Sequence, residues 1–108
     1  MRIQMTTRRC DVPEDVLERA RDQVASLAKF DPRATSAEVV FEEEKQDRKV
    51  EVIVHSDGSG PVVGHGSALE FRRAVDQVVD RVARQLREQR KRHLEHQAPP
   101  LQERMVQD

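Results

Sequence analysis

Several common residue types are scarce in this chain of 108 residues, and each absence excludes a class of protein. The single cysteine, Cys10, rules out an internal disulfide framework and fits a reducing, cytoplasmic environment. No run of about 18 uncharged apolar residues occurs, so we expect no membrane-spanning helix and no membrane partner. The first residues also lack the apolar segment of a secretory signal.

The apolar content is low as well. Hydrophobic residues make up 36% of the chain, which has three phenylalanines and no tryptophan or tyrosine. A chain of this length forms one domain. So small an apolar share predicts a lean core and makes a two-domain enzyme with a deep apolar pocket improbable. The 19 basic and 20 acidic residues give a net charge of −1, which by itself indicates no partner.

Hydrophobic periodicity predicts four strands and two helices. Polar and apolar residues alternate in the strands, where β-branched residues are frequent, and apolar residues recur at helical spacing in the helices. Pro13 suits a first helical turn, and Pro32 requires that helix to stop before Asp31. The predicted strands cover residues 2–6, 37–45, 48–56 and 62–67, with a hairpin turn at Gln46 and Asp47, and the predicted helices cover residues 13–30 and 69–96.

The second helix has the clearest pattern. Its apolar residues lie within roughly 80° of arc at 100° per residue. They are Phe71, Val75, Val78, Val79, Val82 and Leu86. About 27 residues span some 40 Å, so the C-terminal third is expected to project beyond a four-stranded sheet. Gly64 and Gly66, on the inner face of the preceding strand, would let this helix approach closely.

The element order is therefore β-α-β-β-β-α. We expect an α+β fold in which both helices pack on one face of a four-stranded sheet. A single domain would span residues 1–96. Residues 97–108 contain two prolines and few apolar residues, and we expect them to form a disordered tail.

Positive charge concentrates in the long helix. Between Arg81 and Arg92 six bases accompany one acid, Glu88. A solvated helix normally alternates the two signs, so this self-repelling pattern favours an anionic partner, and the planar guanidinium suits phosphate. A solvated face explains the same pattern, and the residues alone leave both interpretations open. The candidate RNA-binding residues are Arg8, Arg9, Arg73, Arg81, Arg84, Arg87, Arg90, Lys91 and Arg92.

The shortage of aromatic residues narrows the kind of RNA recognition. With Phe41 and Phe71 expected in the core, stacking on unpaired bases is disfavoured, which leaves contacts with the phosphate backbone of a structured RNA. Arg84 and Arg90 are expected to face solvent, so replacing either should leave stability nearly unchanged.

Other residue combinations favour structural interpretations. His55 and His65 are expected on the open sheet face, but no zinc-binding spacing frames them or Cys10, so no metal site is predicted. The glutamates at residues 42–44 are interpreted as a solubility device at a sheet edge in preference to a metal cage. No nucleophile elbow, phosphate-binding loop or dinucleotide motif occurs. No motif therefore predicts a catalytic site, and we expect no cofactor and no small-molecule substrate.

One stretch resembles a known family. Three motifs of the long helix are Ala-Val-Asp at residues 74–76, Asp-Arg-Val-Ala-Arg-Gln-Leu at residues 80–86, and the bases Arg90 and Arg92. Together they resemble the last helix of the bacterial ribosome hibernation promoting factors. This family includes protein Y and proteins once named sigma-factor modulators. Strand order and gap lengths agree over nearly all of residues 1–96. Departures from the family pattern are Arg72 in place of a tyrosine, and Ser26 and the glutamates at residues 42–44 in place of lysines.

This resemblance implies a fold similar to a double-stranded-RNA-binding domain and a non-enzymatic protein. Such proteins bind the small ribosomal subunit and its RNA in the channel for messenger and transfer RNA, and they silence translation under stress or in stationary phase. The resemblance implies RNA contacts at Arg81, Arg84, Arg90 and Arg92. Because the chain ends at Asp108, it resembles the short form, which lacks the domain through which long members pair ribosomes. No obligate partner protein is expected. The alternative is a protein-interaction module of the same fold, whose basic helix binds an acidic protein.

Overall fold

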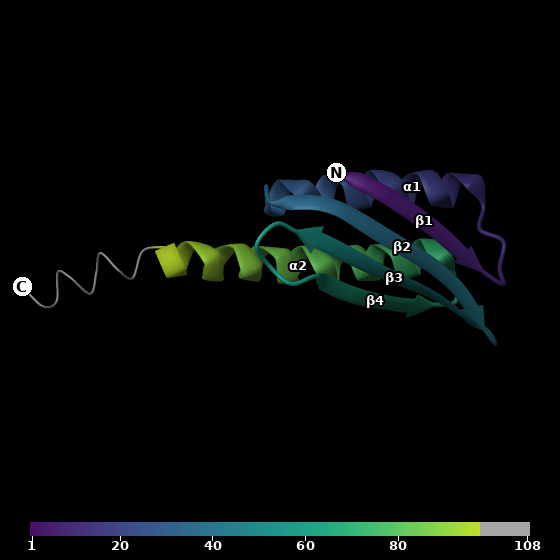
Figure 1. Ribbon diagram of the computed structural model, residues 1–108. Coiled ribbons are helices and arrows are strands. Elements are labelled where there is room, and N and C mark those ends of the chain that lie inside the picture. Colours follow the sequence, from purple (N-terminus) through teal and green to yellow (C-terminus); the bar gives the residue numbers. More distant parts are fainter. Residues whose placement is uncertain (98–108) are drawn as a thin grey trace, which may run out of the picture.

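The computed structural model describes residues 1–97 of the chain, and its elements follow the predicted order (Figure 1). Four strands form one sheet, and two α-helices with a short 3₁₀ turn complete the domain. The strands are β1 (Arg2–Arg8), β2 (Ala34–Glu44), β3 (Asp47–Ser56) and β4 (Val62–Ala68). The helical elements are α1 (Glu14–Ser26), the 3₁₀ turn η1 (Leu27–Phe30) and α2 (Phe71–Gln97).

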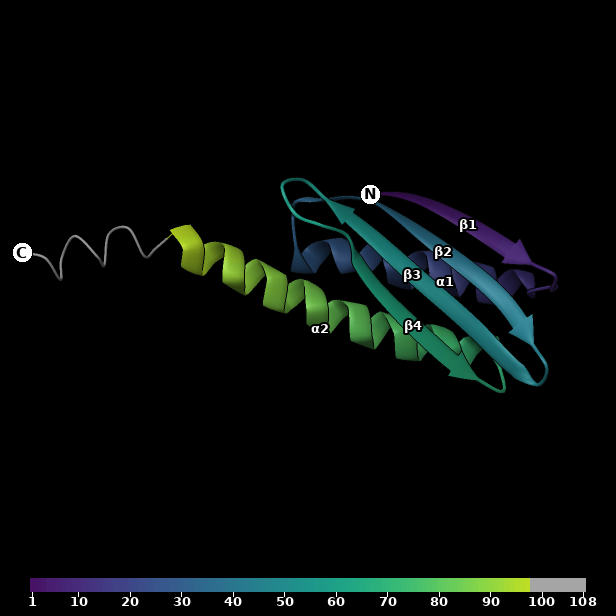
Figure 2. The same cartoon turned by 60° about the horizontal axis from the view of Figure 1, so that its bottom comes forward.

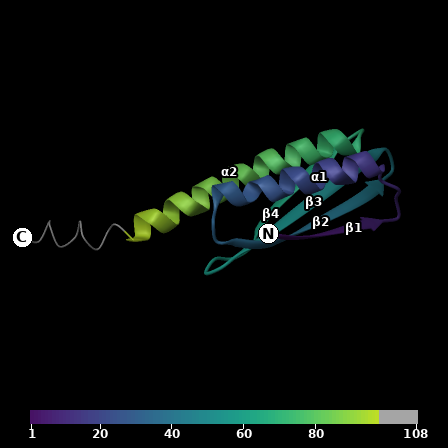
Figure 3. The same cartoon turned by 90° about the horizontal axis from the view of Figure 1, so that it is seen from above.

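The strands lie side by side in the order β1-β2-β3-β4. β1 is parallel to β2, since α1 crosses between them, whereas β2, β3 and β4 form antiparallel pairs. Both helices cover one face of this sheet and the other face is open, which confirms the predicted two-layer arrangement (Figure 3). The core between the layers consists mainly of valines and alanines, and Phe41 and Phe71 meet in it edge to face with ring centres 5.7 Å apart.

Two glycines allow α2 to lie directly on β4. A Cβ atom at Gly66 would lie 2.3 Å from the Ala74 carbonyl oxygen, and one at Gly64 would lie 2.5 Å from a methyl group of Val82. No side chain fits at either position, because helix backbone or a packed valine already occupies the space. The close approach predicted from the two glycines is therefore confirmed.

Most element boundaries differ from the predicted ones by one to three residues, the largest shift being the start of β2 at Ala34. β1 continues to Arg8, the hairpin turn lies at Lys45 and Gln46, and the first helix changes to the 3₁₀ turn η1 after Ser26. Lys45 adopts a positive φ of 57°, which shows that the tight turn is one residue earlier than expected. Gln97, assigned to the tail from the sequence, is the last residue of α2, and the remaining residues 98–108 of the expected disordered tail lie outside the described part of the chain.

α2 is longer than the sheet that it covers. Its last turns extend beyond the sheet, as its length predicts (Figure 2). Leu86 is its last fully buried residue, so the core does not hold the helix beyond that point. Within residues 1–97, no helix is both long and apolar enough to cross a membrane.

Candidate nucleic-acid interface

The outward face of α2 presents a line of bases. Arg73, Arg84 and Lys91 are exposed and lie within about 20° of one another at 100° per residue, opposite the buried valines. Arg84 and Lys91 are seven residues apart, a distance of about 10 Å along the helix. Arg92 is also exposed, on the flank of this line. The valine stripe that anchors α2 to the sheet thus turns these bases toward solvent.

From Arg73 onward, the bases of α2 are not paired with neighbouring acids, whereas Arg72 at its start is. Five other bases of the chain have a carboxylate partner: Arg19 with Asp76, Arg33 with Asp31, Arg48 with Glu43, Lys49 with Glu44, and Arg72 with Asp15. In residues 1–97, no carboxylate oxygen lies within 4.0 Å of a basic nitrogen of any α2 base from Arg73 onward. This set comprises Arg73, Arg81, Arg84, Arg87, Arg90, Lys91 and Arg92.

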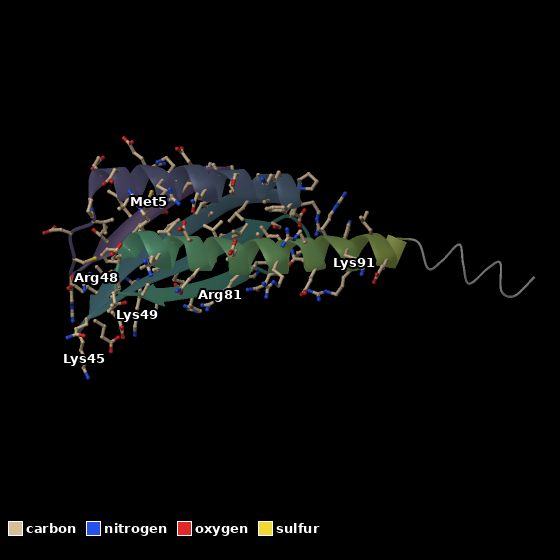
Figure 4. All side chains as sticks on the ribbon, turned by 180° about the vertical axis from the view of Figure 1, so that it is seen from behind. Met5, Lys45, Arg48, Lys49, Arg81 and Lys91 are labelled. Carbon is tan, nitrogen blue, oxygen red and sulfur yellow. The ribbon has the colours of Figure 1, made fainter. Side chains whose placement is uncertain are left out.

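Arg81 lies on the side of α2 that faces the edge of the sheet (Figure 4). Its guanidinium donates a hydrogen bond to the carbonyl oxygen of His65 in β4. One turn before it, Gln77 accepts a bond of 3.1 Å from the Ser67 N–H, and one turn after it, Gln85 donates a bond of 3.1 Å to the Val63 carbonyl oxygen. Three side chains spaced by four residues therefore cap the free edge of β4, a role that was not predicted from the sequence.

The opposite side of α2 faces η1. The guanidinium of Arg87 lies 5.0 Å from the centre of the Phe30 ring, within the range of a cation–π contact. Arg90 is half-buried and lies close enough to Asp31 to help lower the pKa of that carboxyl. The expectation that Arg90 faces solvent is therefore wrong, because η1 and the residues after it reach this side of the helix. Arg84 is exposed, as predicted.

Arg8 and Arg9 lie apart from the outward line of α2. Arg8 ends β1 and borders a hollow on the open sheet face, together with Lys49, Glu51 and Arg81. Arg9 follows in the connection to α1, exposed and with a positive φ of 56°. The predicted bases are thus divided among the open sheet face, the connection after β1, the sheet edge, the outward face of α2 and the side of α2 that faces η1.

His55, His65 and Cys10 are accounted for by local contacts. His55 lies 3.2 Å from Glu38 and His65 lies 3.6 Å from Glu51, each on the open sheet face. Burial raises the pKa of the Cys10 thiol, which donates a hydrogen bond to the Phe41 carbonyl oxygen at 3.6 Å. The described part of the chain holds no group of three or more side chains that could hold a metal ion.

The glutamates at the end of β2 pair with the neighbouring strand. Glu43 lies 3.1 Å from Arg48, and Glu44 lies 2.7 Å from the Lys49 ammonium group, which lowers the pKa of the Glu44 carboxyl. β2 lies between β1 and β3, so the interpretation of these residues as a device at a sheet edge is wrong, and they form cross-strand ion pairs at the end of an interior strand.

Comparison with known proteins decides the family. Residues 3–94 match the family described as Sigma 54 modulation protein / S30EA ribosomal protein, which is most of the chain. The chain belongs to this family. A ribosome hibernation promoting factor of Azotobacter vinelandii is 25% identical over 97 residues, which cover 90% of this chain and 90% of the relative. The resemblance inferred from the last helix is therefore confirmed.

Solved structures of family proteins share the fold. A ribosomal subunit interface protein from Coxiella burnetii matches with a TM-score of 0.78 at 19% identity, over 84% of this chain and 99% of that chain. The N-terminal domain of Protein Y from Thermus thermophilus matches with a TM-score of 0.72 at 21% identity, over 82% and 98%. At these identities the likeness shows the fold, and it confirms the β-α-β-β-β-α prediction.

Proposed function

We propose that this chain is a cytoplasmic, non-enzymatic ribosome hibernation factor. It binds the small ribosomal subunit through contacts between the bases of α2 and ribosomal RNA phosphates. It occupies the channel for messenger RNA and transfer RNA and excludes both RNAs from it. It thereby inhibits translation during stress or stationary phase. The mechanism is steric exclusion combined with electrostatic attraction, and no covalent step is needed.

The unpaired bases of α2 carry this proposal. An exposed guanidinium or ammonium group without a carboxylate neighbour keeps its full charge available to a polyanion, and neutralising phosphates releases their counterions. Arg73, Arg84 and Lys91 form the outward line of that set. The name of the Azotobacter vinelandii relative, ribosome hibernation promoting factor, supports the ribosome as the source of the phosphates.

The positions of the three phenylalanines favour backbone contacts over base contacts. Phe41 and Phe71 are buried, and Phe30 is half-buried beneath the cations of Lys29 and Arg87. Since the chain has no tyrosine or tryptophan, no phenylalanine, tyrosine or tryptophan ring is fully exposed to stack on an unpaired base. Recognition of phosphate positions in a structured RNA is the mode that these residues support.

The double variant Arg84→Gln, Lys91→Gln tests the proposal. We expect its affinity for purified small subunits, measured by sedimentation titration, to fall about tenfold or more, because two phosphate contacts are lost. Its stability should stay within about 0.5 kcal/mol of the parent, since both side chains are exposed.

The matched control is Arg2→Gln, Arg21→Gln, which removes the same charge from exposed positions of β1 and α1. An equal loss of affinity in the control would show that only net charge matters. Absence of binding by the parent protein, or capture of an acidic protein in place of subunits, would overturn the proposal.

A further inference from the structure

The last turns of α2 lack the support that the rest of the helix has. Leu86 is the last fully buried residue of the helix, and the following turns carry Arg87, Arg90, Lys91 and Arg92. An isolated helical segment of about ten residues is marginally stable in water, and like charges on adjacent turns weaken it further. Something other than the core must therefore hold this segment in helical form.

A buried carboxylate next to α2 provides the anchor. Asp31 follows η1 and has a relative exposure of 0%, and it is the only buried charged residue in the described part of the chain. Its carboxylate accepts bonds from Arg33 Nε at 3.1 Å and Arg33 Nη2 at 3.0 Å, a bidentate pair. The Arg33 backbone N–H donates a third bond of 3.0 Å, so both the main chain and the side chain of Arg33 are fixed.

The fixed guanidinium reaches α2. Arg33 Nη1 lies 3.2 Å from Nδ1 of His93, sixty residues further along the chain. A guanidinium can only donate, so His93 Nδ1 is the acceptor in this contact. Arg33 is itself anchored at its carbonyl oxygen, which accepts a bond of 2.9 Å from the Asp57 N–H.

We infer that Asp31, Arg33 and His93 form a latch that holds the basic end of α2 in place for RNA binding. The three residues are positioning residues, because they act through the bases of α2. The role of the latch in RNA binding rests on the proposed function, whereas the latch itself rests on the contacts of Arg33 with Asp31 and His93. By ordering the helix before binding, the latch removes part of the entropic cost of ordering it on the RNA.

The neighbouring contacts of η1 support the same role. Phe30, the residue before Asp31, contacts Arg87 through its ring, six residues before His93. Arg90, between these two positions, is half-buried near the Asp31 carboxylate, which offsets part of the repulsion among the surrounding bases. The latch therefore lies at the end of a continuous row of contacts along one side of the helix.

Two substitutions of His93 separate the bond from the bulk of the side chain. His93→Leu removes the acceptor, whereas His93→Asn keeps a carbonyl oxygen near the position of Nδ1. Leu94→Asn, at an exposed neighbouring residue, controls for the helix propensity of asparagine. All three changes lie beyond the last core residue of α2, so the domain is expected to stay folded.

Amide hydrogen exchange of residues 88–95 in the free protein measures the latch itself. We expect exchange to be about fivefold faster in His93→Leu, the effect of one lost hydrogen bond, and close to the parent rate in His93→Asn and Leu94→Asn. Affinity for small subunits should fall by a similar factor in His93→Leu only, with an unchanged salt dependence, since no charge is lost.

The outcomes distinguish the two proposals. Unchanged exchange in His93→Leu, or equal effects of leucine and asparagine, would overturn the latch even where the parent protein binds subunits. Faster exchange in His93→Leu without any loss of affinity would overturn its positioning role. If the parent protein does not bind subunits at all, the proposed function fails, and the positioning role fails with it.

Discussion

At the scale of single residues, Asp31 shows what a sequence can and cannot predict. The pair Asp31 and Pro32 correctly marked the end of the first helical segment, because proline restricts the residue before it. The burial of the Asp31 carboxylate was not predictable, since it depends on Arg33 and α2 closing over it. Local patterns indicate where a helix ends, whereas burial of a charge depends on residues distant in the sequence.

The acid stability of the protein should depend on Asp31. Burial alone would raise the pKa of this carboxyl, but its hydrogen bonds from Arg33, with the charges of Arg33 and Arg90, hold the pKa below its ordinary value of 3.8. A carboxyl with a lowered pKa in the folded state stabilises the fold fully above the unfolded pKa, and this contribution is lost as the pH falls through the folded pKa.

We therefore predict that Asp31→Asn destabilises the protein by about 3 kcal/mol at neutral pH, because it leaves the largely buried Arg33 without its anion. Urea unfolding of parent and variant between pH 7 and pH 2 measures the difference. It should be constant down to about pH 5 and shrink below pH 4. A difference that is independent of pH would show that the carboxylate charge is not responsible.

At the scale of elements, the close packing of α2 on β4 was predictable from the sequence, whereas the side-chain cap on the edge of β4 was not. The alternating glycines of β4 and the valine stripe of α2 are both visible in the sequence, and together they predict a close helix–strand contact. The edge cap formed by Gln77, Arg81 and Gln85 was not found, although its spacing of four residues is visible once the adjacent strand is known. Amides and guanidiniums at such spacing are common on solvated helices, so the pattern alone does not identify a cap.

The close contact predicts a large cost for Gly66→Ala. The added Cβ would lie 2.3 Å from the Ala74 carbonyl oxygen, which is helix backbone and cannot rotate away. We expect a loss of about 3 kcal/mol or more in the free energy of unfolding, measured by urea titration. Gly60→Ala is the control, because a Cβ there meets nothing within 4 Å, and it should change stability by less than about 0.5 kcal/mol. Equal effects at the two positions would contradict the packing of α2 on β4.

At the scale of the whole molecule, the net charge of −1 conceals a separation of charge. The exposed side of α1 is largely acidic and contributes one carboxylate, Asp15, to a contact with the start of α2, while the later turns of α2 stay positive and unpaired. The excess of positive charge in the later turns of α2 was visible in the sequence. The division of the predicted bases among several surfaces was not, because it depends on how β1, β4 and η1 surround the helix.

The proposed binding should therefore depend on salt in proportion to the phosphates that α2 neutralises. With about five phosphates contacted, the logarithm of the association constant should fall with the logarithm of salt concentration with a slope near −4.5. Arg84→Gln should make this slope less negative by about 0.9, because one contact is removed. Arg21→Gln, on the exposed side of α1, should leave it unchanged. Titrations of small subunits at several salt concentrations measure all three slopes. An affinity that does not change with salt would exclude phosphate contacts as the basis of binding, since displaced counterions are the unavoidable consequence of neutralising a polyanion.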